Sequence, residues 1–326
     1  ILNNGSSDNM KNEGKMFDKS TMFGLFFRGD YSYKGKYLAT VTVRRDASSR
    51  FGEDNRWGTF PSLSLGWRMS DEVFMEKTRT WLDDLKVRAG YGTTGNSNIG
   101  NRAISYYQTG NNNEFGGTES IGVYLSQMGN PDLKWQKTLD KNIGLDLTLL
   151  NNRLNVNLDY YDKLTDPLLA AVSVPSSVGS KRVMTNVGSQ RTQGVSGTVK
   201  YSPVYHPEER INWTLSASFK HQKAKYEDIG NSLDQFNKEN LNTSLVRYYD
   251  GGSPTALWAV RSLGINPSDG RELFLTKEGT YTFEYDTEDE VVVGNSEPKL
   301  EGVLGSTLYW KGFSFSLYFR YSLGAD

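Results

Sequence analysis

The chain has 326 residues, with 37 basic and 38 acidic side chains, two histidines and no cysteine. The balanced charge argues against a nucleic-acid-binding protein, which usually carries an excess of Lys and Arg. The lack of cysteine excludes disulfide bonds, cysteine zinc sites and a thiol nucleophile from this sequence. Apolar runs are short, and none approaches the roughly 20 residues that a membrane-spanning helix needs.

Ten segments alternate apolar and polar residues with a period of two, which is typical of β-strands. In INWTLSASFK, at 211–220, every odd position is apolar and every even position is polar. A short helical turn is expected only between Asp71 and Leu82. In chain order, the expected strands cover 23–33, 37–44, 62–68, 85–92, 142–149, 154–160, 195–201, 211–220, 299–310 and 313–321.

Alternation alone leaves two folds open, because the apolar face can pack on a protein core or face lipid. The connections separate them. They alternate between two ends, with tight turns such as 34–35, 150–152 and 311–312 at one end. The other end carries the long segments 96–133, 165–183 and 227–298, a layout typical of outer-membrane barrels. Two connections, 71–84 and 202–210, are longer than ideal for the short end.

Aromatic residues make up 13% of the chain and gather near the expected strand ends, as in the interfacial girdles of barrels. We therefore predict an all-β fold, an antiparallel transmembrane β-barrel, with 1–326 in one barrel domain and long extracellular loops at about 96–133, 165–183 and 227–298. A soluble β-sandwich or propeller is the alternative. The girdle candidates are Tyr31, Tyr33, Trp57, Trp67, Tyr160, Tyr161, Tyr201, Tyr309 and Trp310.

Nearly half of the sequence consists of stretches that resemble one family, both in their residues and in their order along the chain. They include WLDDLKVRAGYGTTGNSNIGN at 81–101, NPDLKWQKTLDKNIGLDLTLLNNRLNVNLDYYDKLTDPLL at 130–169 and VVVGNSEPKLEGVLGSTLYWKGFSFSLYFRYSLGAD at 291–326. YSYKGKYLATVTVRRDASSRFGEDNRWGTFPSLSLGWRMSDEVFM at 31–75 and TNVGSQRTQGV at 185–195 belong to the same set. On these residues the chain resembles the SusC/RagA TonB-linked outer-membrane transporters of Bacteroidetes.

The resemblance implies a barrel of about 22 strands, closed by a plug and located in the bacterial outer membrane. It also implies a SusD-like lipoprotein lid outside, energy coupling by TonB–ExbB–ExbD inside, and oligosaccharide or sometimes peptide as cargo. Neither enzymatic activity nor a cofactor is implied. Because we find no plug and no TonB box, we expect an internal part of a longer protein, with about eight strands before it and about four after it.

Two sets of side chains are candidates for contacts. Aromatic faces in the long connections stack on sugar rings or anchor protein interfaces, so they are candidates for contact with glycan cargo or with the lipoprotein. Arginines at inward parity are expected to face a wet lumen. The aromatic candidates are Tyr106, Tyr107, Phe115, Tyr124, Tyr248, Tyr249 and Trp258, and the arginines are Arg28, Arg44, Arg68, Arg88 and Arg320.

Three other motifs are weighed and set aside. GYGTTG at 90–95 fits a dinucleotide fingerprint but is followed by a loop sequence instead of a helix. His206 and His221 are expected at opposite ends of the barrel, so no catalytic or metal site is assigned to them. The acidic run EYDTEDE at 284–290 lacks the spacing of an EF-hand and is expected to be a solvated loop.

SusC-like import is therefore the leading interpretation of function. A passive porin or an adhesin barrel is the first alternative, and a TonB box in the full-length protein would exclude it. A secreted soluble carbohydrate-binding β protein or hydrolase is the second. Such a protein would not need detergent for extraction.

Overall fold

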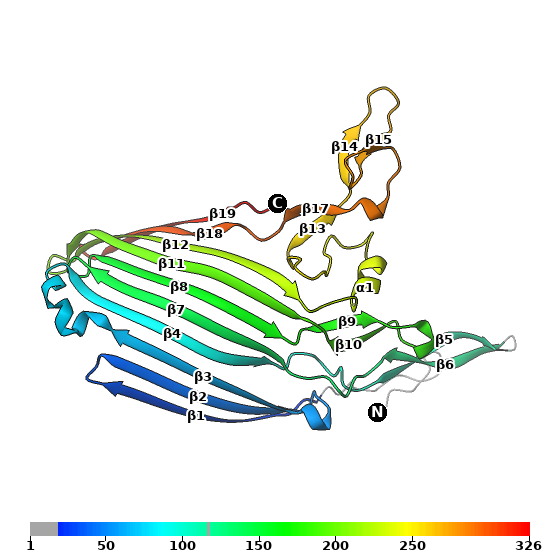
Figure 1. Cartoon of the computed structure of the whole chain (residues 1–326), viewed down its shortest axis with the longest axis horizontal. Helices are drawn as coiled ribbons and strands as arrows, with labels where there is room; N and C mark the ends of the chain where they lie inside the picture. Colours follow the sequence, from blue (N-terminus) through cyan, green and yellow to red (C-terminus); the bar gives the residue numbers. More distant parts are fainter. Residues whose placement is uncertain (1–18, 116–117) are drawn as a thin grey trace.

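An antiparallel ten-stranded sheet forms the body of the described chain (Figure 1). The computed structural model describes residues 19–115 and 118–326, and the side chains of all of these except 108–124 and 176. Neighbouring strands pair in the order β1-β2-β3-β4-β7-β8-β11-β12-β18-β19. Their bounds are β1 Met22–Tyr33, β2 Tyr37–Ser48, β3 Trp57–Arg68, β4 Leu82–Asn96, β7 Gln136–Leu149, β8 Leu154–Asp166, β11 Ser189–His206, β12 Ile211–Glu227, β18 Leu300–Trp310 and β19 Phe313–Leu323.

All ten expected strands are present, and most are longer than the sequence pattern indicates. The largest difference is at 202–210, which was expected to be a connection. β11 continues through most of this segment to His206, after a register shift between Tyr201 and Val204. This β-bulge moves the apolar pattern by one residue and hides the strand from a simple period-two search. The remaining turn, 207–210, is short.

The strand register places the predicted apolar set on a single face. Leu215 lies opposite Tyr201 on β11 and Ser306 on β18. Leu145 lies opposite Val87 and Leu158 on its two neighbours. Directly opposed residues of antiparallel strands share a face. One face is therefore apolar across all ten strands, and the other is polar.

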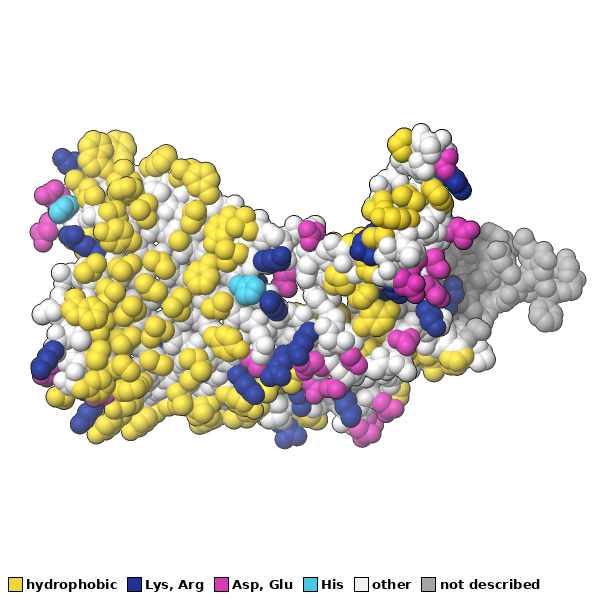
Figure 2. Space-filling model, turned by 45° about the horizontal axis from the view of Figure 1, so that its top comes forward, with side chains coloured by type: hydrophobic (Ala, Val, Ile, Leu, Met, Phe, Trp, Pro, Cys, Tyr) yellow, Lys and Arg dark blue, Asp and Glu magenta, His cyan; other side chains and the backbone are white. Residues whose placement is uncertain are grey.

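The apolar face is not covered by a second layer of the described residues. Trp213 is 37% exposed, and Phe315 on β19 is 65% exposed. Figure 2 shows apolar side chains spread as a broad band over the strands, with charged side chains gathered toward its two ends. We call this band the apolar belt. Among the described residues, no helix is long and apolar enough to cross a membrane.

The short connections lie at one end of the sheet and are built from turns. The turn at 34–36 uses Lys34 at φ 52° and Gly35 at φ 68°. The helical turn expected between Asp71 and Leu82 is present as two 3-10 segments, Met69–Asp71 and Val73–Thr78. Hydrogen bonds from the Tyr37 hydroxyl and other donors hold the pKa of Glu72, between these segments, below its usual range.

The long connections at the other end contain secondary structure of their own, where the sequence predicts loops without regular elements. Each long connection carries at least one β-hairpin (Figure 1). These elements are β5 Tyr106–Phe115, β6 Thr118–Gln127, β9 Leu169–Ser173, β10 Arg182–Asn186, α1 Asp234–Glu239, β13 Ala256–Ala259, β14 Arg261–Ile265, β15 Glu272–Leu275, β16 Tyr281–Thr282 and β17 Val291–Asn295. Short 3-10 turns cover Glu53–Asn55, Ser176–Val178 and Thr287–Asp289.

A small aromatic core anchors the connection between β4 and β7. Trp135 is 3% exposed and stacks on Phe51 at a centroid distance of 4.9 Å, while Phe60 meets it edge-on at 5.4 Å. The indole Nε1 of Trp135 donates a hydrogen bond to the carbonyl of Arg56 at 3.1 Å. This cluster ties segment 49–56 to the connection.

Replacing Gly52 with alanine is expected to destabilise this anchor. A Cβ atom at Gly52 would meet the backbone carbonyl of Pro131, which cannot move away like the end of a side chain. Overpacking of this kind typically costs about 1–3 kcal/mol. Limited proteolysis of the purified protein should show faster cleavage near 97–135. Gly29→Ala is a control for loss of a glycine, because its φ is not positive and its Cβ position would meet only the Phe27 ring at an ordinary contact distance of 3.6 Å. Equal protection of Gly52→Ala and the parent would contradict the expected clash.

Candidate functional site

The polar face of the sheet carries all five arginines that the sequence placed at inward parity, and each has a carboxylate partner on the same face or beside it. Arg88 is the most connected. Its Nε lies 2.8 Å from Asp146 Oδ2, and its Nη2 donates to Asp159 Oδ1 at 2.9 Å. The other pairs are Arg28–Asp30 at 2.9 Å, Arg44–Asp46 at 2.7 Å, Arg68–Asp84 at 3.4 Å and Arg320–Glu301 at 3.8 Å.

These pairs give the polar face a charged but nearly neutral surface. Glu301 is shared between Arg320 and Lys220, which lies 3.2 Å away. Charged groups at this density are tolerated where water reaches them and are costly against lipid. The carboxylate partners come from the sheet itself, so the arginines do not require partners from another domain.

A large hollow opens where the long connections meet. Its volume is about 1330 Å³, and the hairpins β5–β6 and β9–β10 and helix α1 contribute to its walls. Arg102, Lys181 and Arg182 lie along it together with one carboxylate, Glu239. The pKa of Glu239 is held below its usual range. The largest cause is the hydrogen bond from the Ser173 hydroxyl, and neighbouring side chains donate further hydrogen bonds. The hollow therefore has a net positive lining.

The aromatic candidates are distributed over three separate places. Tyr249, 41% exposed, lies at a centroid distance of 5.4 Å from Trp258 and forms an aromatic pair in the connection between β12 and β18. Tyr106 and Tyr107 are exposed on the β5–β6 hairpin, with Tyr107 68% exposed. The side chains of Phe115 and Tyr124 lie outside the described residues.

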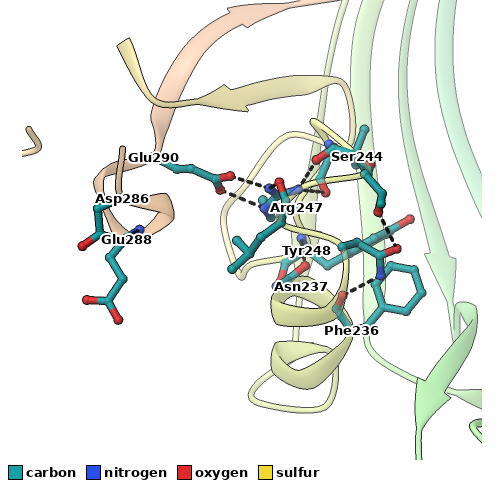
Figure 3. Close-up of polar contacts among 12 residues, drawn as sticks. Phe236, Asn237, Ser244, Arg247, Tyr248, Asp286, Glu288 and Glu290 are labelled. Carbon is teal, nitrogen blue, oxygen red and sulfur yellow. Dashed lines mark hydrogen bonds and ion pairs between the residues drawn. The ribbon is translucent and has the colours of Figure 1, made fainter. Parts of the chain in front are cut away.

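Tyr248 is partly buried and packs against other aromatic side chains. Its ring meets Tyr226 at 5.4 Å and Phe236 at 5.6 Å. Its backbone is held by Asn237, whose side-chain amide donates to the Tyr248 carbonyl at 2.9 Å and whose Oδ1 accepts from the Tyr248 N–H at 3.0 Å. Figure 3 shows Asn237 on α1 directed at this backbone segment. Its position indicates packing instead of ligand contact.

A buried arginine organises the connection between β12 and β18, and no pattern in the sequence indicates it. Arg247 is 1% exposed, and its Nε and Nη2 donate to the two oxygens of Glu290 at 2.9 and 2.6 Å (Figure 3). The same guanidinium donates to the carbonyls of Leu241, Ser244 and Val246. We call Arg247 and Glu290 the arginine clamp. It joins residues 43 positions apart in the chain.

The clamp corrects the expectation that 284–290 is wholly solvated, because Glu290 is only 7% exposed. The neighbouring carboxylates serve the local backbone. Asp286 accepts a hydrogen bond from the Glu288 N–H at 2.8 Å, and Asp289 accepts one from the Lys277 N–H at 3.0 Å. Among the described residues, no group of three or more His, Cys, Asp or Glu side chains is arranged to hold a metal ion.

The remaining motifs fall where the sequence predicts. His206 lies opposite Ile211 at the short end, and His221 lies ten residues farther along β12, a distance of about 33 Å in an extended strand. GYGTTG lies wholly within β4, which continues to Asn96. Gly90 and Gly92 belong to the polar face. Two of the girdle candidates, Tyr161 and Tyr309, lie on the polar face. Each is the chain neighbour of a residue on the apolar face, and successive residues of a strand point to opposite faces.

Comparison with known proteins agrees with this architecture. The sequence profile described as "TonB dependent receptor-like, beta-barrel" matches residues 3–324. TonB-dependent receptor P39 of Formosa agariphila is 30% identical over the whole chain, which covers 35% of that receptor. TonB-dependent receptor SusC of Bacteroides thetaiotaomicron is 30% identical over 94% of this chain and 31% of SusC. The chain thus spans about a third of these curated relatives.

A solved structure supports the same assignment. The structure titled as the RagAB peptide transporter matches with a TM-score of 0.80 and 27% identity, over 98% of this chain and 36% of that one. The relatives are receptors and transporters, not enzymes, and they are outer-membrane proteins. With an up-and-down sheet, one apolar and one polar face, and a profile match over almost its entire length, the chain belongs to the TonB-dependent receptor-like β-barrel family.

Proposed function

We propose that the chain forms part of the wall of a SusC-like importer, which takes up oligosaccharides or peptides through the outer membrane together with a SusD-like lipoprotein. The observation that carries the proposal is the two-faced sheet. Its apolar face is continuous across ten strands, while its polar face holds water-compatible ion pairs such as Arg88 with Asp146 and Asp159. In this arrangement lipid meets the apolar face, and the polar face borders an aqueous lumen.

The long connections are then the extracellular loops at about 96–133, 165–183 and 227–298. The cationic hollow and the Tyr249–Trp258 pair are the candidate contacts for cargo. The exposed residues Leu263, 51%, and Ile265, 69%, on the projecting strand β14 are the candidate contacts for the lipoprotein. Exposed apolar side chains that gather on a projecting hairpin are candidates for contact with another protein.

Energy coupling separates this proposal from a passive porin. The full-length protein and its lipoprotein are expressed in a host strain, and uptake of labelled oligosaccharide and peptide mixtures is measured with and without a functional TonB system. Import should stop when TonB is absent or when the proton gradient is dissipated. Uptake that continues unchanged without TonB would overturn active import in favour of passive diffusion.

The aromatic pair gives a test at the level of residues. Replacing Tyr249 and Trp258 together with alanine is expected to weaken cargo binding about tenfold, equivalent to ~1.4 kcal/mol, because stacking area is lost at an exposed site. Binding is measured by calorimetry with the full-length transporter and its transported cargo. Tyr285→Ala is the control, since Tyr285 is 56% exposed in the same connection but pairs with Phe274. Equal affinities for the parent and the double variant would remove the pair from the cargo site.

A further inference from the structure

We propose that the outward face of β7, β8, β11 and β12 carries a binding patch for the phosphate groups of anionic membrane lipids. The patch lies at the end of the sheet from which the long connections emerge. We call it the basic patch. Its four cations are Lys141, Arg191, Lys223 and Lys225.

The register places the basic patch beyond the apolar belt along these four strands. One outward row crosses them at Ile143, Tyr160, Val195 and His221, and beyond it the outward positions are mostly polar, with Leu139 and Leu164 as apolar exceptions. The next outward row, two residues farther along each strand, contains Lys141 and Lys223 at its two ends, with Asp162 and Gln193 between them.

Arg191 and Lys225 are opposite one another in the row after that. A two-residue step is about 7 Å along a strand, and the tilt of barrel strands reduces its rise along the membrane normal to about 5 Å. The cations therefore lie about 5–10 Å beyond the row of Ile143 on their own strands, which overlaps the headgroup region of about 5–8 Å in one leaflet. The aromatic ring of Tyr91, 52% exposed, lies opposite Lys141, as expected for an interfacial residue.

The patch has an excess of positive charge that its own carboxylates do not balance. Arg191 is held by Asp162 through two hydrogen bonds of 2.9 and 2.8 Å, and Lys225 lies 2.7 Å from Glu227. Lys141 and Lys223 are exposed, and neither forms an ion pair with a described residue. Four cations against these two carboxylates leave a net charge of +2.

The charge is confined to one end of these strands. At the short-turn end, the outward positions of the same four strands are apolar or aromatic, such as Leu149, Leu154, Tyr201 and Ile211. A strand end that faces only water would not require an excess of positive charge. Figure 2 shows Lys and Arg side chains gathered beyond one end of the apolar band.

The position of the patch identifies its occupant. The patch is on the outward side of central strands, so the neighbours at this height are lipid headgroups and not cargo in the lumen. The negative groups of headgroups are phosphates, and each Lys or Arg near an anionic membrane surface contributes about 1 kcal/mol to binding. The stem of Lys141 can lie along Leu139, two residues away on the same outward face, while its ammonium group reaches the phosphates. The inference rests on the outer-membrane location and not on the cargo.

The test uses the full-length protein, delipidated in detergent, with lipid A as the probe. Binding is followed by native mass spectrometry for the parent and for Lys141→Gln combined with Lys223→Gln. The double variant should bind lipid A about 25-fold more weakly, since each charge removed corresponds to about fivefold. Lys34→Gln combined with Lys311→Gln removes the same charge from exposed turns at the short end and should bind like the parent.

Three results would overturn the proposal. Unchanged binding by the patch variant would show that these lysines do not meet lipid phosphates. Equal weakening by the turn variant would show a general effect of net charge. Competition by millimolar inorganic phosphate as effectively as by lipid A would indicate a free-anion site instead of a lipid site. Heat-modifiable gel mobility confirms that both variants are folded, and TonB-dependent uptake is scored separately, so failure here leaves the import proposal intact.

Discussion

Replacing Leu65 with arginine is expected to lower the free energy of unfolding of the membrane-embedded protein by about 1–3 kcal/mol. Leu65 lies one two-residue step inside the girdle candidate Trp67, and the cost falls from about 2–4 kcal/mol at the midplane to about 0–1 kcal/mol near the interfaces. Leu65 is 47% exposed on the apolar face of β3, between Ala39 and Ala89 on the neighbouring strands. Its exposed surface meets lipid in our account, and a guanidinium there would lose its hydration without gaining a partner. Denaturant titration of the full-length protein in vesicles measures the loss.

Ser64 provides the matched control one residue away. It lies on the polar face between Thr40 and Gly90. Thr40 already donates to Asp30 at 2.7 Å, so a carboxylate is close enough to accompany a new arginine. Ser64→Arg should change stability by clearly less than Leu65→Arg. Equal losses for the two variants would contradict the assignment of faces.

Replacing Arg247 with methionine is expected to release the connection between β12 and β18 while leaving the sheet folded. Methionine keeps much of the apolar volume but leaves Glu290 as a buried carboxylate without a partner, which typically costs about 3–5 kcal/mol. Three backbone carbonyls lose a donor at the same time. Hydrogen exchange should report loss of protection over 230–290, and cargo binding should fall because Tyr249 and Trp258 lie in the same connection.

Arg271→Met is the comparison for this variant. Arg271 also pairs with a carboxylate, Asp269 at 2.8 Å, but its side chain is 63% exposed. Ion pairs of this kind contribute about 0–1 kcal/mol, so protection should stay near that of the parent. If Arg247→Met left exchange over 230–290 unchanged, the clamp would not be the element that holds this connection.

The ten strands were predictable because polar and apolar side chains alternate residue by residue along them. This alternation reflects the different solvent on each side of the sheet. Ile211, Trp213 and Leu215 indicate a face without knowledge of the partner strands. The same parity placed Arg88 and the other four arginines on the polar face. The girdle assignment of Tyr161 and Tyr309 rested on closeness to a strand end and not on parity, and both lie on the polar face. Parity failed at 202–206, where the bulge after Tyr201 interrupts the period.

The long connections could not be predicted in the same way, since their structure depends on contacts between distant residues. Nothing near Arg247 in the sequence marks it as buried, and Glu290 looks like one more member of an acidic run. Only the folded chain brings them within 2.6 Å. Tyr248 and Tyr249 are adjacent, yet one packs on Tyr226 and the other pairs with Trp258. Neither periodicity nor composition distinguishes these two tyrosines.

The most direct test of the account is the solvent that each face of β12 meets. The chain contains no cysteine, so Leu215→Cys and Ser216→Cys give single sites within it for a fluorescent label on the two faces. With the full-length protein in vesicles, lipid-attached quenchers should reduce the signal at Leu215→Cys. A water-soluble quencher should instead reduce the signal at Ser216→Cys. Quenching from water at Leu215→Cys, with no effect of the lipid quencher, would contradict a membrane-facing apolar belt.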